Sequence, residues 1–163
     1  MPSVLLGLGS NLGRRRDHLR RALTALAERL EITATSAVYE TAPMYVTEQP
    51  RFLNMVVGGE TAMPAAALLA WLKSLEAGLG RTASVRFGPR AIDLDILFYG
   101  RDVVATPALT IPHPRLAERA FVLRPLADIA PHRRHPVTGR RVDEMLADLQ
   151  ETAEVSLKYQ ALP

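Results

Sequence analysis

Residues 32–61 read ITATSAVYETAPMYVTEQPRFLNMVVGGET, and this stretch indicates two consecutive strands with no helix between them. In its first part, alternate positions face one side, as in a half-buried strand: Ile32, Ala34, Ser36 and Val38. Residues 53–61 form a second strand-like run, and a polar segment marked by prolines, 41–51, lies between the two. A doubly wound parallel sheet needs a helix at that place, so the pattern argues against one.

The elements before and after this stretch complete a ferredoxin-like order. A short apolar strand at Ser3–Leu8 precedes an amphipathic helix at Arg15–Leu30, and a second helix runs from Pro64 to Gly80. The clearest strand in the chain is Ala91–Tyr99. Because the order is strand, helix, strand, strand, helix, strand, we expect an α+β fold with a ferredoxin-like βαββαβ core and an antiparallel sheet.

The C-terminal part carries weaker signals. Residues 103–111 indicate another strand, interrupted by Pro107, and Val142–Leu149 indicate a short helix. The final residues receive no assignment, so we expect a C-terminal extension beyond the core. Neither an internal repeat nor a low-complexity linker divides the sequence, and residues 1–163 are expected to form a single domain.

Composition excludes several classes of protein. Hydrophobic residues make up 48% and charged residues 23% of the chain, unlike disordered or membrane-spanning proteins. The longest uncharged stretch on a helical pattern, Thr61–Leu72, is too short to cross a bilayer, and no secretory signal is visible. We therefore expect no membrane partner. The absence of cysteine excludes disulfides and thiolate metal sites, and it fits a cytoplasmic protein.

The charge of the chain permits an anionic ligand without requiring one. The net charge is +3, the calculated pI is about 9.7, and Arg outnumbers Lys among the 20 basic residues. The planar guanidinium group matches phosphate oxygens. A genome that favours Arg codons explains the same composition equally well.

The strand IDLDILF at residues 92–98 carries the most informative chemistry. Because side chains alternate along a strand, Ile92, Leu94, Ile96 and Phe98 are expected to share the core face. Asp93 and Asp95 then point together from the other face, about 7 Å apart along the strand. Two oxygen-only ligands without His or Cys nearby favour Mg²⁺ that is also held by substrate phosphates. Two solvated acids on an exposed face remain the alternative, since Asp-x-Asp alone is common.

Basic residues flank this strand on both sides in the sequence. The loop Arg81–Arg90 carries three Arg residues and no apolar periodicity, which suggests a lid over a metal-bound polyphosphate or, alternatively, a solvated surface loop. His113 lies between two prolines and near Arg115 and Arg119. It is a candidate for phosphate contact, and a purely structural His is the alternative.

Two further patterns receive a plain interpretation. Residues 7–13, GLGSNLG, follow a strand and precede a helix, but the third glycine is one residue too late for a dinucleotide fingerprint. We expect a turn that lets Asn11 and the backbone approach another group closely. The motif HRRH at residues 132–135 is expected to be a solvated loop.

Six segments together resemble one known family, 6-hydroxymethyl-7,8-dihydropterin pyrophosphokinase. They occur in the family's order and cover the chain to about Pro131, and the run around the two acids is highly specific. The segments are GSNLG at 9–13, YETAP at 39–43, QPRFLN at 49–54, RFGPRAIDLDI at 86–96, IPHP at 111–114 and RAFVLRPL at 119–126.

The resemblance implies a monomeric enzyme of folate biosynthesis. It would transfer pyrophosphate from ATP to the hydroxymethyl group of 6-hydroxymethyl-7,8-dihydropterin, giving AMP and the pterin diphosphate. By the same resemblance, Asp93 and Asp95 would hold two Mg²⁺ ions and form a catalytic set with Arg81 and Arg90. The remaining ATP contacts would come from Glu76, Ile96, Leu109, Thr110, His113 and Arg119, together with the same two arginines.

The resemblance also implies a pterin site. The ring would stack between Phe52 and Phe121, while Asn54 and the backbone near Thr41 and Met44 would read its edge. These residue types suit the task, because aromatic faces stack on a flat ring and an amide both donates and accepts hydrogen bonds.

Departures from the family pattern concern loop closure. Phe87 stands where Trp is common, Ala83 and Ser84 stand where basic residues are frequent, and Pro114 replaces an aromatic or polar residue. Two other functions stay open. One is a basic ferredoxin-like module that binds single-stranded nucleic acid, although we expect no nucleic-acid partner, and the other is a metal-dependent phosphohydrolase.

Overall fold

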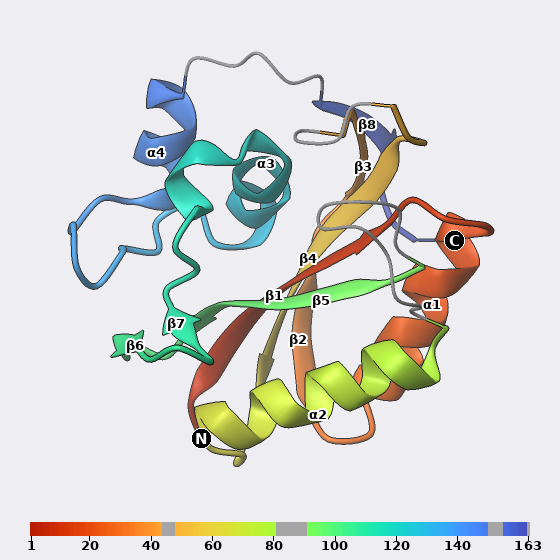
Figure 1. Cartoon of the computed structure of the whole chain (residues 1–163). Coiled ribbons are helices and arrows are strands. Elements are labelled where there is room, and N and C mark those ends of the chain that lie inside the picture. The colour runs from red at the N-terminus through yellow and green to blue at the C-terminus, as the bar shows by residue number, and fades with distance from the viewer. Residues whose placement is uncertain (44–47, 81–90, 150–154, 163) are drawn as a thin grey trace.

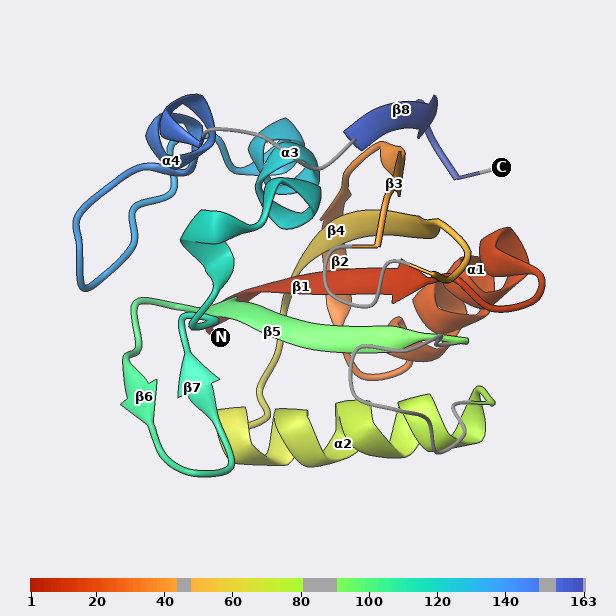
Figure 2. The ribbon, with the colours of Figure 1, turned by 45° about the horizontal axis from the view of Figure 1, so that its top comes forward.

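A computed structural model of the chain describes residues 1–43, 48–80, 91–149 and 155–162. One antiparallel sheet lies between two helical layers (Figures 1 and 2). Helices α1 (Arg15–Leu26) and α2 (Ala65–Gly78) cover one face, and α3 (Ala120–Ile129) and α4 (Val142–Asp148) lie on the other side. None of the described helices is long and apolar enough to cross a membrane.

The strand order confirms the expected ferredoxin-like core. The main path runs β5-β1-β4-β3-β8, and β2 also pairs with β4. The first core strand, β1, therefore lies between the fourth, β5, and the third, β4. All pairings in this sheet are antiparallel. The strands are β1 (Ser3–Ser10), β2 (Glu31–Thr35), β3 (Val38–Thr41), β4 (Phe52–Glu60), β5 (Asp93–Tyr99) and β8 (Val155–Tyr159).

The strand expected at residues 32–38 is interrupted. β2 pairs with one end of β4 and β3 with the other, and Ser36 lies between them. The Ser36 N–H donates to the Val56 carbonyl at 2.9 Å, while the Ser36 hydroxyl accepts from the Val56 N–H at 2.8 Å. A buried hydroxyl therefore takes the place of a backbone carbonyl at the break, and the chain can bend there without leaving an amide unsatisfied.

Two apolar clusters, one on each face of the sheet, hold the layers together. A bulge in β5 places Phe98 on the face opposite to the one expected. The pairing of β5 with β1 shifts register opposite Leu5 and Leu6, so that β5 carries one extra residue. Ile96 packs in the cluster under α1 and α2, whereas Leu97 and Phe98 both pack in the cluster under α3 and α4. The expectation that Phe98 shares the face of Ile96 is wrong, because one inserted residue reverses the alternation.

Part of the C-terminal region was not expected from sequence. Helix α3 follows a short 3-10 turn (Leu116–Glu118), and β8 adds a strand to the edge of the sheet beside β3. The expected strand at 103–111 is a hairpin of β6 (Val104–Ala105) and β7 (Thr110–Ile111), with Pro107 in its turn. The expected helix at Val142–Leu149 is α4, one residue shorter.

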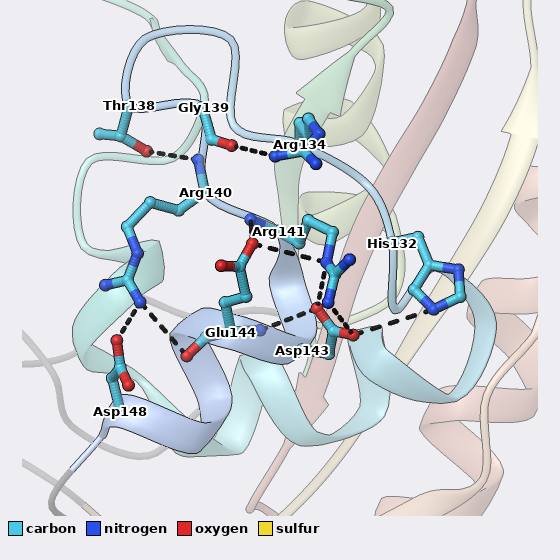
Figure 3. Close-up of polar contacts among 9 residues, drawn as sticks. All are labelled: His132, Arg134, Thr138, Gly139, Arg140, Arg141, Asp143, Glu144 and Asp148. Atoms are coloured by element: carbon cyan, nitrogen blue, oxygen red, sulfur yellow. Dashed lines mark hydrogen bonds and ion pairs between the residues drawn. The ribbon is translucent and has the colours of Figure 1, made fainter.

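Side-chain contacts tie the segment before α4 to the helix itself (Figure 3). The Arg141 guanidinium contacts Asp143 at 2.9 Å and Glu144 at 3.4 Å, and Glu144 accepts the Arg141 N–H at 3.1 Å. Arg140 forms an ion pair with Asp148, and Arg134 donates to the Gly139 carbonyl at 2.8 Å. These contacts are all local, so the segment forms a compact cap on the end of the helix.

The expectation of a solvated loop at HRRH is wrong for two of its four residues. The Arg133 guanidinium lies 5.2 Å from the centre of the Phe98 ring and donates to the Gly100 carbonyl. The His135 ring meets the same Phe98 edge-on at 6.3 Å between centroids. Burial lowers the pKa of both side chains, with Arg101 also lowering that of Arg133. The two residues pack the C-terminal segment against β5, a contact that local sequence cannot reveal.

Candidate active site

The paired acids of β5 lie on the sheet face opposite α1 and α2. Asp93 and Asp95 are half-buried, while Ile92 and Leu94 beside them are buried in the core. In the sheet, Asp93 lies directly across from Gly9, and Asp95 across from Gly7. Directly opposed residues project to the same face, so the neighbouring strand places no side chain beside either carboxylate. The predicted alternation of the two acids is confirmed.

Glu76 holds the acidic strand from its outer edge. Because β5 is an edge strand, the Leu94 N–H has no sheet partner, and the Glu76 carboxylate accepts it at 2.8 Å. Lys73 donates to the other oxygen at 3.3 Å, and Glu76 is only 2% exposed. This side chain therefore fixes the main chain between the two acids.

His113 lies near Asp95 and near two arginines, Arg115 and Arg119. The His113 N–H donates to the Leu97 carbonyl at 3.1 Å, which attaches this residue to β5. The His113 Nδ1 accepts the Arg115 N–H at 3.2 Å, so in the neutral ring the proton lies on Nε2. Burial lowers the pKa of His113; the charge of Asp95 opposes this shift, and Arg119 and Arg115 add to it. The ring can therefore donate from Nε2 among groups that suit a phosphate.

The residues expected near adenine lie along the free edge of β5. The backbone of Ile96 faces the same way as that of Leu94, because this direction alternates along a strand, and β7 packs next to β5. Thr110 is exposed on β7. Leu109 exchanges backbone and side-chain hydrogen bonds with Thr106, at 2.9 to 3.3 Å. The N–H and carbonyl of Leu109 are thus already bonded to Thr106, and the main-chain groups of Ile96 and Thr110 suit contact with an adenine edge better.

The residues of β4 expected to bind the pterin lie on the same face, two strands from β5. Asn54 of β4 lies directly across from Gly9 on one side and Tyr39 on the other. Its Nδ2 donates to the Thr41 hydroxyl at 2.7 Å, and the two residues are 8% and 1% exposed. A Cβ on Gly9 would lie 2.7 Å from the Asn54 Oδ1, which is closer than real contacts allow. Only glycine at position 9 leaves the Asn54 amide in this place.

Two other expected residues come from the start of α3, which lies over this face. The Arg119 guanidinium lies 5.4 Å from the centre of the Phe121 ring, and both side chains are partly exposed. Phe52 is partly exposed on β4, two residues before Asn54. Arg81, Arg90, Met44 and the lid expected at residues 81–90 lie outside the described residues.

The loop after β1 behaves as expected from its sequence. The Asn11 side chain is buried and donates to the Gln49 Oε1 at 2.8 Å and to the Pro50 carbonyl at 3.0 Å. Arg15 donates to the Arg51 carbonyl at 3.0 Å and pairs with Glu40 at 2.9 Å. These contacts fix the segment that leads into Phe52.

The donor set fits Mg²⁺ held jointly by the protein and a phosphate ligand. Within the described parts of the chain, no cluster of three or more His, Asp or Glu side chains is arranged to hold a metal. Two carboxylates on an open face provide only oxygen ligands. Mg²⁺ commonly takes one or two carboxylates and completes its shell with water and substrate phosphates.

Comparison with known proteins assigns the chain to a family. The sequence profile of 7,8-dihydro-6-hydroxymethylpterin-pyrophosphokinase (HPPK) matches residues 5–131. The chain belongs to this family. The resemblance through about Pro131 is therefore confirmed. The HPPK match ends at residue 131, two residues after the end of α3.

Relatives of two architectures are similar to this HPPK chain. The 2-amino-4-hydroxy-6-hydroxymethyldihydropteridine pyrophosphokinase of Bacillus subtilis (strain 168) is 42% identical over 141 residues, which cover 85% of this chain and 84% of that protein. The mitochondrial folate synthesis bifunctional protein of Pisum sativum is 49% identical over 127 residues, 77% of this chain. The chain spans about a quarter of the length of that bifunctional relative, 25%.

Solved structures support the fold. The HPPK-DHPS of Plasmodium falciparum, crystallised with pteroate, matches 90% of this chain and 42% of its own length with a TM-score of 0.73. Its sequence identity is 18%, so this likeness concerns the arrangement of helices and strands.

Proposed function

We propose that this chain transfers the pyrophosphoryl unit of ATP to the hydroxymethyl group of 6-hydroxymethyl-7,8-dihydropterin, giving AMP and the pterin diphosphate in folate biosynthesis. One observation supports the proposal most strongly: Asp93, Gly9 and Asn54 lie in a single row across three adjacent strands. With strands about 4.8 Å apart, the acid and the amide are about 10 Å from each other. That separation suits a polyphosphate at one end and a small heteroaromatic alcohol at the other.

The reaction needs positioning and charge stabilisation more than covalent help. The alcohol oxygen attacks the β-phosphorus, the bond from that phosphorus to the oxygen it shares with the α-phosphorus breaks, and AMP leaves with that oxygen. The alcohol proton passes to solvent. Negative charge spreads over the phosphoryl oxygens during transfer, and cations and N–H donors directed at them lower the barrier.

The proposed phosphate contacts come from several parts of the chain. Arg119 and the Nε2 of His113 would meet the triphosphate near Asp95, and the sequence adds Arg81 and Arg90 from outside the described residues. Bound Mg²⁺ would neutralise phosphate charge and polarise the attacking hydroxyl. Asp93 and Asp95 would together hold two Mg²⁺ ions. Glu76 would keep their strand in place.

The proposed pterin contacts use the opposite end of the row. Phe52 and Phe121 would stack on the two faces of the ring. Asn54, fixed by Thr41, would pair with the ring edge together with backbone near Met44. For adenine, Ile96, Leu109 and Thr110 provide the proposed contacts. We further propose a monomer located in the cytoplasm, which acts on these small molecules alone.

Analysis of the nucleotide product tests the function. Incubation of the protein with Mg²⁺, ATP and the dihydropterin should yield AMP in a one-to-one ratio with the pterin diphosphate, and omission of the pterin should abolish AMP formation. ADP as the product would indicate transfer of a single phosphoryl group. Free phosphate formed without pterin would favour the phosphohydrolase alternative instead.

A further inference from the structure

A polar contact between two distant segments joins α3 to the sheet. The Tyr39 hydroxyl of β3 donates to the Asp128 carboxylate of α3, at 2.9 Å and 3.0 Å to its two oxygens. The same carboxylate accepts the Ala37 N–H at 3.2 Å. Asp128 thus binds a side chain of β3, that of Tyr39, and a main-chain group of the bend before β3, the Ala37 N–H.

One end of this contact lies beside the proposed pterin site, and the other lies on the helix that carries Phe121. Tyr39 lies directly across from Asn54 in the β3–β4 pair. Asp128 follows Phe121 by seven positions on one helix, which corresponds to about 10 Å along the axis at 1.5 Å per residue. Since a short helix moves as a rigid body, the place of Asp128 helps to determine the place of Phe121.

Apolar packing alone does not determine how α3 is rotated. Leu123 and Leu126 bury the helix against Val56 and Leu97. Apolar burial is non-directional, whereas a hydrogen bond requires a specific distance and angle. The hydrogen bonds of Asp128 with the Tyr39 hydroxyl and the Ala37 N–H therefore provide a directional constraint on the helix.

We propose that Tyr39 and Asp128 are positioning residues that orient α3 over the sheet, so that Phe121 meets the pterin ring at the right height above Asn54 and Arg119 meets the phosphates. This inference rests on the proposed function. Neither residue touches a substrate in this account, and both act through the helix.

The protonation of Tyr39 is compatible with this role. Burial raises the pKa of Tyr39 to about 12, with the hydrogen bond and the charge of Asp128 adding to the shift and Arg124 opposing it. The hydroxyl therefore stays protonated, and able to donate, throughout the range in which the protein would work.

Substitutions Tyr39→Phe and Asp128→Ala test the proposal, with Tyr99→Phe as the matched control. The Tyr99 hydroxyl also makes one strong hydrogen bond, to the Met63 carbonyl at 2.6 Å, but it joins β5 to the segment before α2. Asp128→Asn keeps an acceptor oxygen for Tyr39 and should recover part of the loss.

The readout is binding, so that it does not depend on turnover. The Kd of 6-hydroxymethylpterin is measured with Mg²⁺ and α,β-methylene ATP, together with the Kd of that analogue alone and the melting temperature. Tyr39→Phe and Asp128→Ala should weaken pterin binding by between about threefold and about tenfold, the equivalent of one hydrogen bond. They should change the analogue Kd less, because Arg119 is one of several proposed phosphate contacts. Tyr99→Phe should change the melting temperature only.

Two results separate the possible failures. If the unsubstituted protein binds no pterin, the proposed function is wrong. If it binds pterin and Tyr39→Phe binds it as tightly as Tyr99→Phe does, the positioning role is wrong. Should Asp128→Ala fail to fold, Tyr39→Phe still decides, because it removes only a hydroxyl group.

Discussion

Gly7 and Gly9 make room for side chains of the neighbouring strands, since Leu97 lies over Gly7, and Asn54 and Phe52 lie over Gly9. The two glycines lie between the two acids of β5 and the residues of β4 that we assign to the pterin. The Asn54 amide can therefore lie directly over β1, and only one strand separates it from the acids of β5. Residues that contribute no side chain are as important to this site as the charged ones.

Gly9→Ala should reduce pterin binding sharply. The new Cβ would lie 2.7 Å from the Asn54 Oδ1, so the amide must move and lose its bond to Thr41. We expect the pterin Kd to rise by at least about tenfold while the ATP-analogue Kd stays nearly constant. Gly78→Ala is the matched control, since apart from its own helix no atom of the described residues lies within 4 Å of its new methyl group. An alanine at position 78 of helix α2 should raise stability by up to about 1 kcal/mol.

Asp93→Asn and Asp95→Asn should each remove most activity without unfolding the protein. Both acids lie on the open face and contribute nothing to the apolar core. Loss of a charged metal ligand should cost about 3 kcal/mol in the transition state, which is about a hundredfold in kcat. Asp102→Asn, an exposed acid just beyond β5, is the control. Near-normal turnover of both variants at saturating Mg²⁺ would rule out a metal site at these carboxylates.

Among the elements, β5 depends on α2 for its position. Glu76→Ala leaves the Leu94 N–H buried without an acceptor, which should cost about 1 to 3 kcal/mol of stability and also reduce activity. Glu76→Gln keeps an acceptor oxygen, so it should restore most of the stability. Urea unfolding and kcat of both variants distinguish the hydrogen bond from the charge. Equal stability of the two variants would show that the Leu94 contact contributes little.

The C-terminal cap should make stability depend on pH through His135. The His135 Nδ1 accepts N–H groups of Val137 and Thr138, at 3.2 and 3.3 Å, and burial lowers its pKa. The unfolded chain therefore takes up a proton first. The stabilisation is fully present above the unfolded pKa of about 6.5 and is lost as the pH falls from there toward the lower folded value.

His135→Asn tests this dependence, because asparagine does not titrate. The free energy of unfolding is measured from pH 7.5 to pH 5 by urea titration. The variant should show a shallower decline with acid than the unsubstituted protein, although His113 contributes a decline of the same sign. If the free energy of unfolding of the variant fell as steeply with acid as that of the unsubstituted protein, His135 would not contribute to the pH dependence.

For the molecule as a whole, β8 closes an edge of the sheet that would otherwise be open. It pairs with β3, the strand that carries Tyr39 and Thr41, and the Arg16 guanidinium lies 5.8 Å from the Tyr159 ring. A chain that ends at Leu149 should unfold at lower urea concentration and show a smaller m-value, since it buries less surface. It should also aggregate more readily through the exposed edge of β3. An unchanged unfolding midpoint would contradict a stabilising role for β8.

The sequence predicted the parts of the fold that depend on local periodicity. The alternation around Asp93 and Asp95, both helices of the core and the order of the core strands are all visible within short windows. Helix α3 was missed because Pro125 lies inside it and proline disfavours a helix interior, and β8 was missed because most of its side chains are exposed. The bulge at Leu97 is set by pairing with β1, so the face of Phe98 could not be read from β5 alone.

The candidate site divides in the same way. The acids, His113 and Asn54 belong to motifs that resemble the family, and the structure brings the described ones to a common face. The contact of Tyr39 with Asp128 spans 89 positions and has no local signal. Gly9 was interpreted as part of a turn, whereas it is a strand residue in contact distance of Asn54. Partners that are distant in sequence require the folded chain.

The fate of the ATP phosphates provides the decisive measurement. The protein is incubated with Mg²⁺, the dihydropterin and ATP labelled at either the α- or the γ-phosphorus, and the products are separated. We predict that the γ-label appears in the pterin product and the α-label in AMP, because both terminal phosphates move together. Label from the γ-position in free phosphate, or α-label in ADP, would contradict pyrophosphoryl transfer.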